Sequence, residues 1–194
     1  MFNLKITNMK KTLLVLLCMI SAIALNAQTS KSTNYVYGVD YTHAKVFAAD
    51  ESIADFTKAF EGINMLLLSE SDKYDFTRVL GKTANIVIEP IMKITAIADY
   101  DNMMTLSNIY DEPNTAEIVR NYELSQTEGT GIVMIAKFLD KPNARATYDI
   151  VVFDIATRKI LQEKEVIGEA GGFGLRNYWA RTVYNIIEKT KLYK

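Results

Sequence analysis

The stretch from Gly131 to Lys194 decides the fold, and it reads GIVMIAKFLDKPNARATYDIVVFDIATRKILQEKEVIGEAGGFGLRNYWARTVYNIIEKTKLYK. Two apolar runs, 132–139 and 150–153, are joined by a turn in which Pro142 suits the first corner and Asn143 the second. Hydrophobicity that is continuous rather than alternating predicts central strands covered on both faces.

The rest of this stretch predicts an edge strand and a closing helix. Residues 160–167 carry four consecutive polar or charged side chains, as expected of a solvated edge strand. After a glycine cluster, one helical face carries Trp179, Val183, Ile186, Ile187 and Thr190. The stretch therefore predicts a three-stranded antiparallel meander covered by a C-terminal helix.

Upstream, an aromatic-rich alternation over 35–42 predicts a first strand that continues toward residue 47. Apolar residues then recur at helical spacing over 53–67. Ser52 and Asp55 precede and enter this run as a variant capping box with the shorter acid. The long, regular pattern predicts a helix that packs one face against the sheet.

The middle of the chain is less regular. We expect a short helix over 73–80 that stops at Gly81, a brief strand over 85–89 closed by Pro90, and a helix over 116–124 capped by Thr115. Residues 91–114 show no clear period. The predicted fold class is α/β (α+β): a single-domain sandwich over 28–194, with a mixed β-sheet, a C-terminal antiparallel meander and a closing helix.

Residues 1–27 have the pattern of a signal peptide. Lys10 and Lys11 precede the apolar run Leu13–Leu25, and Ala27 supplies a small residue for cleavage. The run is shorter than the roughly 20 residues that span a bilayer, so we expect cleavage rather than an anchor. Cys18 lies inside the apolar run without a small residue before it, which argues against lipidation.

Export would change the charge and the chemistry of the chain. Removing 1–27 takes away three lysines and no acid, so the formal net charge goes from −1 to −4. Mild acidity argues against nucleic acid as a partner. The only cysteine also leaves, which excludes a disulfide, a thiolate nucleophile and a cysteine zinc site. We expect a periplasmic or secreted protein, without a membrane span after cleavage and without a cofactor.

The glycine cluster before the last helix is the sharpest local feature. Backbone amides at a helix start can hold an anion, and an arginine can add a charged fork, so the candidate ligand-binding residues are Gly171, Gly172, Gly174, Arg176 and Asn177. The spacing fails the dinucleotide and Walker motifs, because Asn177 replaces the third glycine and no Lys-Ser/Thr pair follows. The alternative is a tight turn in which Asn177 caps the helix.

Other residues offer weaker signals. His43 is the only histidine and no Gly-x-Ser-x-Gly elbow accompanies it, so we expect no catalytic triad. Residues 99–102 (Asp-Tyr-Asp-Asn) lack the glycine and the distal glutamate of a calcium loop, so we expect a solvated turn and no metal site. Asp149 and Asp154 flank a buried strand at an odd spacing, which places them on opposite faces.

The block GGFGLRNYWA at 171–180 resembles the C-terminal part of an uncharacterised family of small secreted or periplasmic proteins of Gram-negative bacteria. The resemblance covers about the last third of the chain and implies export without a particular activity. The order of elements is also similar to the N-terminal domain of TolB-type proteins and to curli-secretion-type lipoproteins, which is an analogy of fold alone.

The sequence supports three functional hypotheses. The first is an exported, non-enzymatic module of the cell envelope that binds a protein partner, based on the signal peptide and the aromatic first strand. The second is a small-ligand or anion binder that uses the turn Gly171–Asn177. The third is a hydrolase-like enzyme, which no catalytic motif in the sequence supports.

Overall fold

The computed structural model describes residues 32–193, so the predicted signal peptide lies outside the described residues. The strands are β1 (Asn34–Asp40), β2 (Lys45–Phe47), β3 (Asn85–Ile86), β4 (Met104–Thr105), β5 (Thr130–Asp140), β6 (Arg145–Asp154) and β7 (Ile160–Glu169). The helices are α2 (Ile53–Ser69), α3 (Thr77–Leu80), α4 (Glu89–Ile97), α5 (Thr115–Arg120) and α6 (Leu175–Lys189).

All seven strands belong to one mixed sheet, which confirms the α/β class. β5, β6 and β7 pair antiparallel, whereas β1 with β3, β1 with β5, β2 with β4 and β2 with β5 all pair parallel. The prediction placed the antiparallel meander at the centre of the fold, and this is corrected: four of the six strand pairings are parallel. The sequence pattern did not predict which strands form the parallel pairs.

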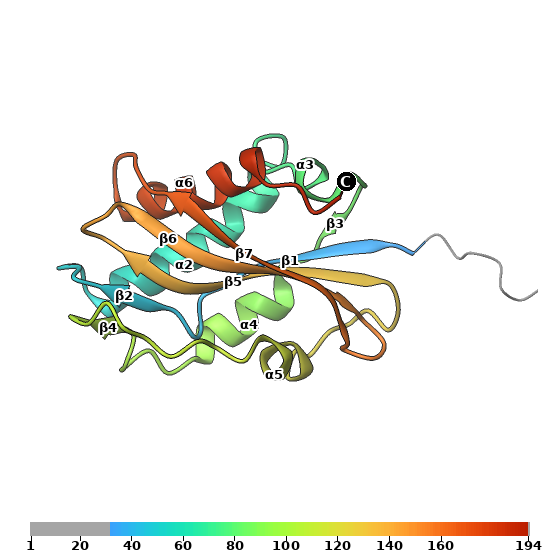
Figure 1. Cartoon of the computed structure of the whole chain (residues 1–194), viewed down its shortest axis with the longest axis horizontal. Helices are drawn as coiled ribbons and strands as arrows, with labels where there is room; N and C mark the ends of the chain where they lie inside the picture. The colour runs from blue at the N-terminus through green and yellow to red at the C-terminus, as the bar shows by residue number, and fades with distance from the viewer. Residues whose placement is uncertain (1–31, 194) are drawn as a thin grey trace, which may run out of the picture. The chain divides into compact units, whose positions relative to one another are not determined.

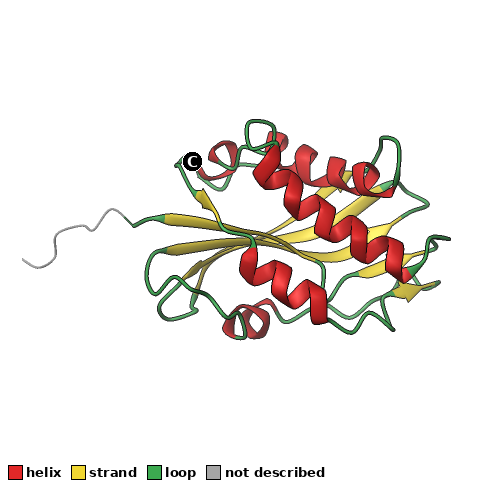
Figure 2. Ribbon diagram, turned by 180° about the vertical axis from the view of Figure 1, so that it is seen from behind, coloured by secondary structure: helices red, strands yellow, loops and turns green. Residues whose placement is uncertain are grey.

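The sheet is covered on both faces (Figure 1). α2 and α6 lie on one face and α4 and α5 on the other, as the view from behind also shows (Figure 2). The larger core contains Phe56, Phe60, Trp179 and Val183 from the first helix pair; the smaller contains Ile91, Ile118 and Tyr122 from the second. Cover on both faces explains the unbroken burial of residues 131–140 in β5.

The first strand is interrupted rather than continuous. β1 and β2 both pair with the same edge of β5, and residues 41–44 form a turn between them. Gly38 has φ +100°, and the register with β5 shifts between Val36 and Val39. Beyond the end of β3, the buried Asn64 of α2 accepts from the Val39 N–H (2.8 Å) and donates to the Val39 C=O (2.9 Å). A side-chain amide thus takes the place of a neighbouring strand.

Two of the predicted helix signals are confirmed. Ser52 and Asp55 form the capping box of α2, each side chain bonding the other residue's backbone N–H. Gly81 ends α3 in the left-handed conformation, at φ +64°. α3 itself is shorter than predicted, since only Thr77–Leu80 is helical and the preceding residues are turns.

Three other local predictions are wrong. Pro90 does not close a strand: it lies in the first turn of α4, where a missing N–H costs nothing. Asn114, not Thr115, caps α5 by accepting from the Glu117 N–H (3.2 Å). Asn177 does not cap α6, because that helix begins at Leu175 and its N-cap is Gly174. The errors at Thr115 and Asn177 shift the start of a helix by a few residues, whereas the error at Pro90 leaves out the helix α4 altogether.

Strand ends line up across one end of the sheet. In the register, Phe47 of β2 lies between Thr105 of β4 and Asp140 of β5. Asp140 also pairs with Arg145 of β6, and Arg145 in turn pairs with Glu169 of β7. The loop after β4 and the glycine cluster after β7 therefore leave the sheet at the same end. Among the described helices, none is both long and apolar enough to cross a bilayer.

Candidate functional site

The glycine cluster forms a sharp corner between β7 and α6. The Ala170 N–H donates to the Ala144 carbonyl, the Gly171 N–H donates to the Tyr178 carbonyl, and the Tyr178 N–H donates to the Gly174 carbonyl. Gly172 and Gly174 have φ of +110° and +79°, a region that side chains with a Cβ rarely adopt. The corner is therefore fixed at both sides, and its tip carries Phe173.

Phe173 at this tip is 95% exposed. Arg176 does not reach toward it: the Arg176 guanidinium donates twice to Asn177 Oδ1 (3.1 and 3.0 Å). A Cβ on Gly62 would lie only 2.7 Å from Arg176 Cδ, so the aliphatic part of Arg176 passes close over α2. The arginine and the asparagine of the predicted site thus bind each other instead of converging on one point with the glycines.

A hollow of about 400 Å³ lies beside the corner. Of the predicted residues, only Gly171 and Asn177 line it. The others on its wall are Leu66, Glu70, Lys73, Tyr74, Arg181 and Tyr184, from the end of α2, the turn after it and α6. Lys73 is already paired with Glu70 (2.9 Å), and that hydrogen bond raises the pKa of Lys73. Arg181 is the remaining cation of this lining and has no ion pair with another residue of 32–193, so the corner hollow offers its guanidinium to an anion.

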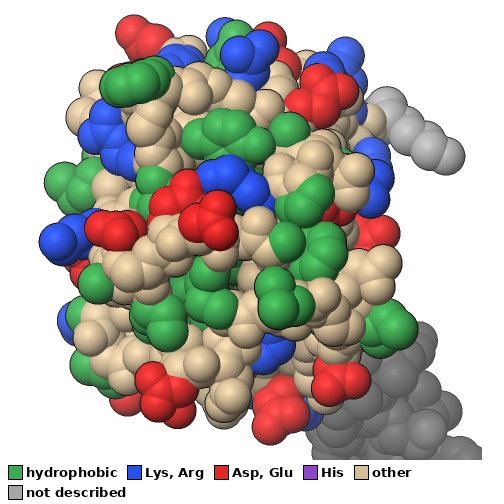
Figure 3. Space-filling view, turned by 90° about the vertical axis from the view of Figure 1, so that its left-hand side faces the viewer, with side chains coloured by type: hydrophobic (Ala, Val, Ile, Leu, Met, Phe, Trp, Pro, Cys, Tyr) green, Lys and Arg blue, Asp and Glu red, His purple; other side chains and the backbone are tan. Residues whose placement is uncertain are grey.

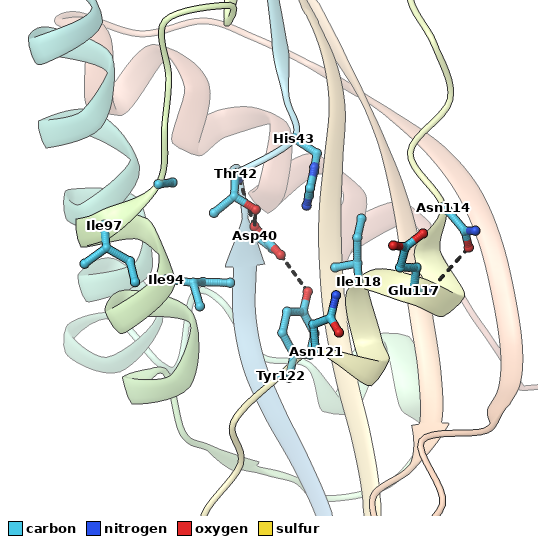
Figure 4. A pocket seen from close by; sticks show the side chains of 11 residues that line it. Asp40, Thr42, His43, Ile94, Ile97, Asn114, Glu117, Ile118, Asn121 and Tyr122 are labelled. Carbon is cyan, nitrogen blue, oxygen red and sulfur yellow. Dashed lines mark hydrogen bonds between the residues drawn. The ribbon is translucent and has the colours of Figure 1, made fainter.

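A larger hollow, about 500 Å³, opens at the carboxyl end of β1 (Figure 4). Side chains at the end of β1 lie between those of α4 and α5 in this view. We call it the β1 hollow; its wall is formed by Asp40, Thr42, His43, Ile94, Ile97, Ala98, Asn114, Glu117, Ile118, Asn121 and Tyr122. In the sheet β1 lies between β3 and β5 and pairs parallel with both, so the hollow lies outside the carboxyl end of a parallel strand.

Asp40 is the organising residue of the β1 hollow. It is fully buried, and its Oδ1 accepts from the Thr42 N–H (2.9 Å) and hydroxyl (2.7 Å). Its Oδ2 accepts from the Tyr122 hydroxyl (2.7 Å) of the segment after α5. Burial, and then the Asp40 charge, raise the pKa of Tyr122 well above its ordinary value, so the phenol stays a donor at neutral pH.

His43, the only histidine, is exposed and lies on the wall of the β1 hollow and of a second, adjoining hollow of about 330 Å³. The second hollow carries Asp99, Asp111 and Glu112, with Lys45 donating to the Asn102 carbonyl (2.6 Å). Asp99 accepts from the Asp101 N–H (2.9 Å), as in a solvated turn. Among residues 32–193, no three histidine, cysteine or acidic side chains are grouped to hold a metal ion.

A buried ion cluster occupies the sheet itself. Lys137 of β5 has a side chain only 5% exposed, and its ammonium binds Glu112, Glu165 (2.6 Å) and Asp149 (3.4 Å). Burial lowers the pKa of Lys137, but the hydrogen bonds to the two glutamates and the Asp149 charge outweigh it and raise the pKa overall. Burial raises the pKa of Asp149 despite Lys137. The single polar residue in an apolar run is therefore explained by three acids from other elements.

Asp40, Asp149 and Asp154, three carboxylates on the strands β1 and β6, have separate partners. Asp149 binds Lys137, whereas Asp154 accepts from the Thr157 N–H (2.8 Å) and hydroxyl (2.7 Å) in a local turn. Asp40 binds Thr42 and Tyr122. Within the described chain these three carboxylates are held apart by different contacts, and none of the contacts places two of them against one reacting atom.

Sequence reasoning missed the β1 hollow. Its residues come from 40–43, 94–98 and 114–122, and the middle set falls in a segment that showed no period. The signal available was the position of Asp40, an acid at the end of an apolar strand. Comparisons of the chain with protein-family models, with curated proteins and with solved structures find no match.

Proposed function

We propose that this protein is an exported, non-enzymatic module of the cell envelope that binds a protein partner through the end of the sheet where β2, β4 and β5 finish. The observation that carries the proposal is the exposure of two large apolar side chains on loops at that end. Phe173 is 95% exposed and Leu106 is 90% exposed. Large apolar side chains with so high an exposed fraction favour a surface that contacts another molecule.

The register of the sheet supports one surface rather than two separate ones. Leu106 follows Thr105 directly, and Phe173 lies four residues after Glu169, the two outer members of the aligned row of strand ends. Figure 3 views this end, and hydrophobic side chains gather on it above and below a central band of charged groups. Apolar centres with charged neighbours are typical of specific, reversible interfaces.

The export part of the proposal rests on residues 1–27. A basic start, an apolar run and a small residue before Gln28 favour cleavage and transport across the inner membrane. Mass spectrometry of the N-terminal peptide from cells that produce the protein tests this part alone. A peptide that begins near Gln28 supports export, and a retained N-terminus contradicts it.

Site-specific crosslinking in intact cells tests the binding surface. A photoreactive phenylalanine analogue replaces Phe173 or Leu106, and a matched control replaces Lys82, an exposed residue at the opposite end of the sheet, next to Thr83, whose carbonyl accepts from Asn34. We expect one adduct of the same mass from positions 173 and 106 and none from position 82. Equal adducts from all three positions, or none from either test position, would contradict the proposal.

A second candidate function is binding of a small anion at the corner hollow. Arg181, which has no ion pair within the described part of the chain, lies beside Gly171 and Asn177 and favours it. Thermal unfolding in inorganic phosphate tests it against the first. Phosphate should raise the unfolding temperature of the parent and not of Arg181→Ala, while Arg176→Ala, whose guanidinium is held by Asn177, should retain most of the effect. An equal shift in the parent and in Arg181→Ala would exclude the corner hollow.

A further inference from the structure

The β1 hollow has the size and position of a small-molecule site. Its volume of about 500 Å³ falls within the range of about 300–1,000 Å³ that is common for ligand pockets. It lies outside the carboxyl end of β1, which is flanked in the sheet by the parallel strands β3 and β5. Ligands of open α/β sheets bind in crevices at such positions, because loops and helix ends there can diverge.

One wall of the hollow is apolar. Ile94 and Ala98 of the α4 side are half-buried, Ile118 of α5 is buried, and Ile97 at the rim is 84% exposed. An isoleucine held in water beside a concave surface loses its unfavourable hydration when an apolar group covers it. This wall therefore fits the hydrocarbon part of a ligand.

The other wall is negatively charged. Asp40 and Glu117 line it, and no lysine or arginine of the described chain does. Asp40 is held in place by Thr42 and Tyr122 before any ligand arrives. The Glu117 carboxylate is exposed and has no ion pair with another described residue. Opposite charge within a partly enclosed site attracts a cation and repels an anion.

The adjoining hollow extends the same field. It shares Thr42 and His43 with the β1 hollow and adds Asp99, Asp111 and Glu112. Of these acids Glu112 is paired with Lys137, and the one lysine of the lining already donates to the Asn102 carbonyl. A positively charged ligand therefore meets acidic groups on its approach as well as at the site. Among the described residues that line the two hollows, Lys45 is the only lysine or arginine that an anionic ligand would meet.

From this arrangement we propose that the β1 hollow binds a small amphipathic amine, with its ammonium at the exposed Glu117, in the field of the buried Asp40 charge, and its apolar body against Ile94, Ile97 and Ile118. The ammonium fits because it can donate hydrogen bonds to the exposed Glu117 carboxylate. The Asp40 carboxylate, whose oxygens already accept from Thr42 and Tyr122, contributes its charge. The apolar body confers selectivity over a simple metal ion or inorganic cation, which would leave the isoleucines exposed. This site shares no residue with the loop surface of Phe173 and Leu106, so the amine proposal does not depend on the proposed partner surface.

Titration with 2-phenylethylamine, observed by the amide shifts of the ¹⁵N-labelled protein, tests this proposal. Two matched probes keep the ring and change the charge: 2-phenylethanol is neutral and phenylacetate is anionic. The amine should give saturable shifts at the amides of Asp40, Thr42 and Ile118, with a dissociation constant on the order of 1–10 mM for a probe of this size. The alcohol should bind about tenfold more weakly, and the carboxylate should not saturate.

Variants assign the binding to the hollow. Glu117→Gln should raise the dissociation constant of the amine about tenfold, which corresponds to about 1.4 kcal/mol. Glu123→Gln removes an exposed acid of the same region that does not line the hollow, and it should change nothing. Ile97→Ser should raise the constant about fivefold for the amine and the alcohol alike. All three positions are exposed, so circular dichroism should show unchanged folds.

Two results would overturn the proposal. The first is the same set of shifts, with similar constants, from the amine and from phenylacetate, because a site without charge selection is not an amine site. The second is an amine titration that stays linear to about ten times the expected constant, or one in which Glu117→Gln and Glu123→Gln weaken binding equally. Charge on the surface in general, and not this hollow, would then account for any shifts.

Discussion

Replacing Asn64 with leucine should destabilise the fold severely, although the two side chains have the same branching and the same number of heavy atoms. Asn64 is fully buried and bonds both the N–H and the C=O of Val39, where β1 runs beyond the end of β3. Leucine fills the space and offers no polar group. Both backbone groups of Val39 then stay buried without a partner, on the edge of β1 that extends beyond the end of β3.

The expected loss follows from these two groups. Each buried backbone group left without a partner costs about 1–3 kcal/mol, so the pair costs about 2–6 kcal/mol. Leucine is a better helix former than asparagine by a few tenths of a kcal/mol, about 0.5 kcal/mol at most, which offsets little. At about 2–4 °C per kcal/mol for a domain of this size, the unfolding temperature should fall by roughly 5–20 °C.

Urea unfolding and hydrogen exchange measure this prediction together. Urea gives the free energy, and the Val39 amide should change from slow to fast exchange in the variant. Met65→Leu, a half-exposed position on the same helix, is the control and should change stability by less than about 0.5 kcal/mol. A loss below about 1 kcal/mol in Asn64→Leu, with the Val39 amide still protected, would refute the reasoning.

Gly38→Ala probes the same contact from the strand. A Cβ at this position would lie 2.4 Å from Asn64 Oδ1, and φ is +100°. The double variant with Asn64→Ala should be less damaged than the sum of the single losses, because the clash disappears with the amide while the backbone strain remains. Strict additivity would mean that the two residues do not interact.

Three further predictions concern the ion cluster, the buried tyrosines and the corner. Lys137→Met should lower the free energy of unfolding in urea by about 3–5 kcal/mol at pH 7, because Asp149 stays buried without its cation. This loss of stability should become smaller toward pH 4, because the pKa of Asp149 is raised and its carboxylate takes up a proton more readily in the folded state. Absorbance at 295 nm should show that Tyr122 ionises only on unfolding. The free energy of unfolding should fall as pH rises above about 10, because the pKa of Tyr122 is raised in the folded protein and ordinary in the unfolded chain. Smooth titration of all tyrosines before unfolding would contradict this. Phe173→Ser should leave the unfolding temperature within about 2 °C of the parent, because the ring is 95% exposed, and it should abolish crosslinking from position 106 if one partner covers both loops.

Local features of the fold were predictable because their causes are local. The capping box at Ser52 and Asp55, the stop at Gly81 and the turn at Pro142 depend on residues a few positions apart. The edge character of β7 was also predictable, since it pairs only with β6 and its charged residues face solvent. Pro90 was misread because a proline can either end a strand or begin a helix, and the next residues showed no clear period.

The candidate sites were predictable only in part. The glycine cluster does make a constrained corner, as the sequence indicated. However, Arg176 bonds Asn177, and only Gly171 and Asn177 reach a hollow. The β1 hollow needed three segments, 40–43, 94–98 and 114–122, to meet. No spacing within one segment encodes such a meeting.

By itself the sequence determined the α/β class, the helices whose apolar residues recur at helical spacing, the solvated edge strand β7 and the glycine corner before α6. These features follow from side chains that are near one another in the chain. Only the tertiary structure decided that the pairings of β1 and β2 with β5 are parallel, that Asn64 replaces a strand beside Val39, and that three acids surround Lys137. These depend on contacts between residues far apart in the chain. Their free energy appears only when the whole sheet is assembled.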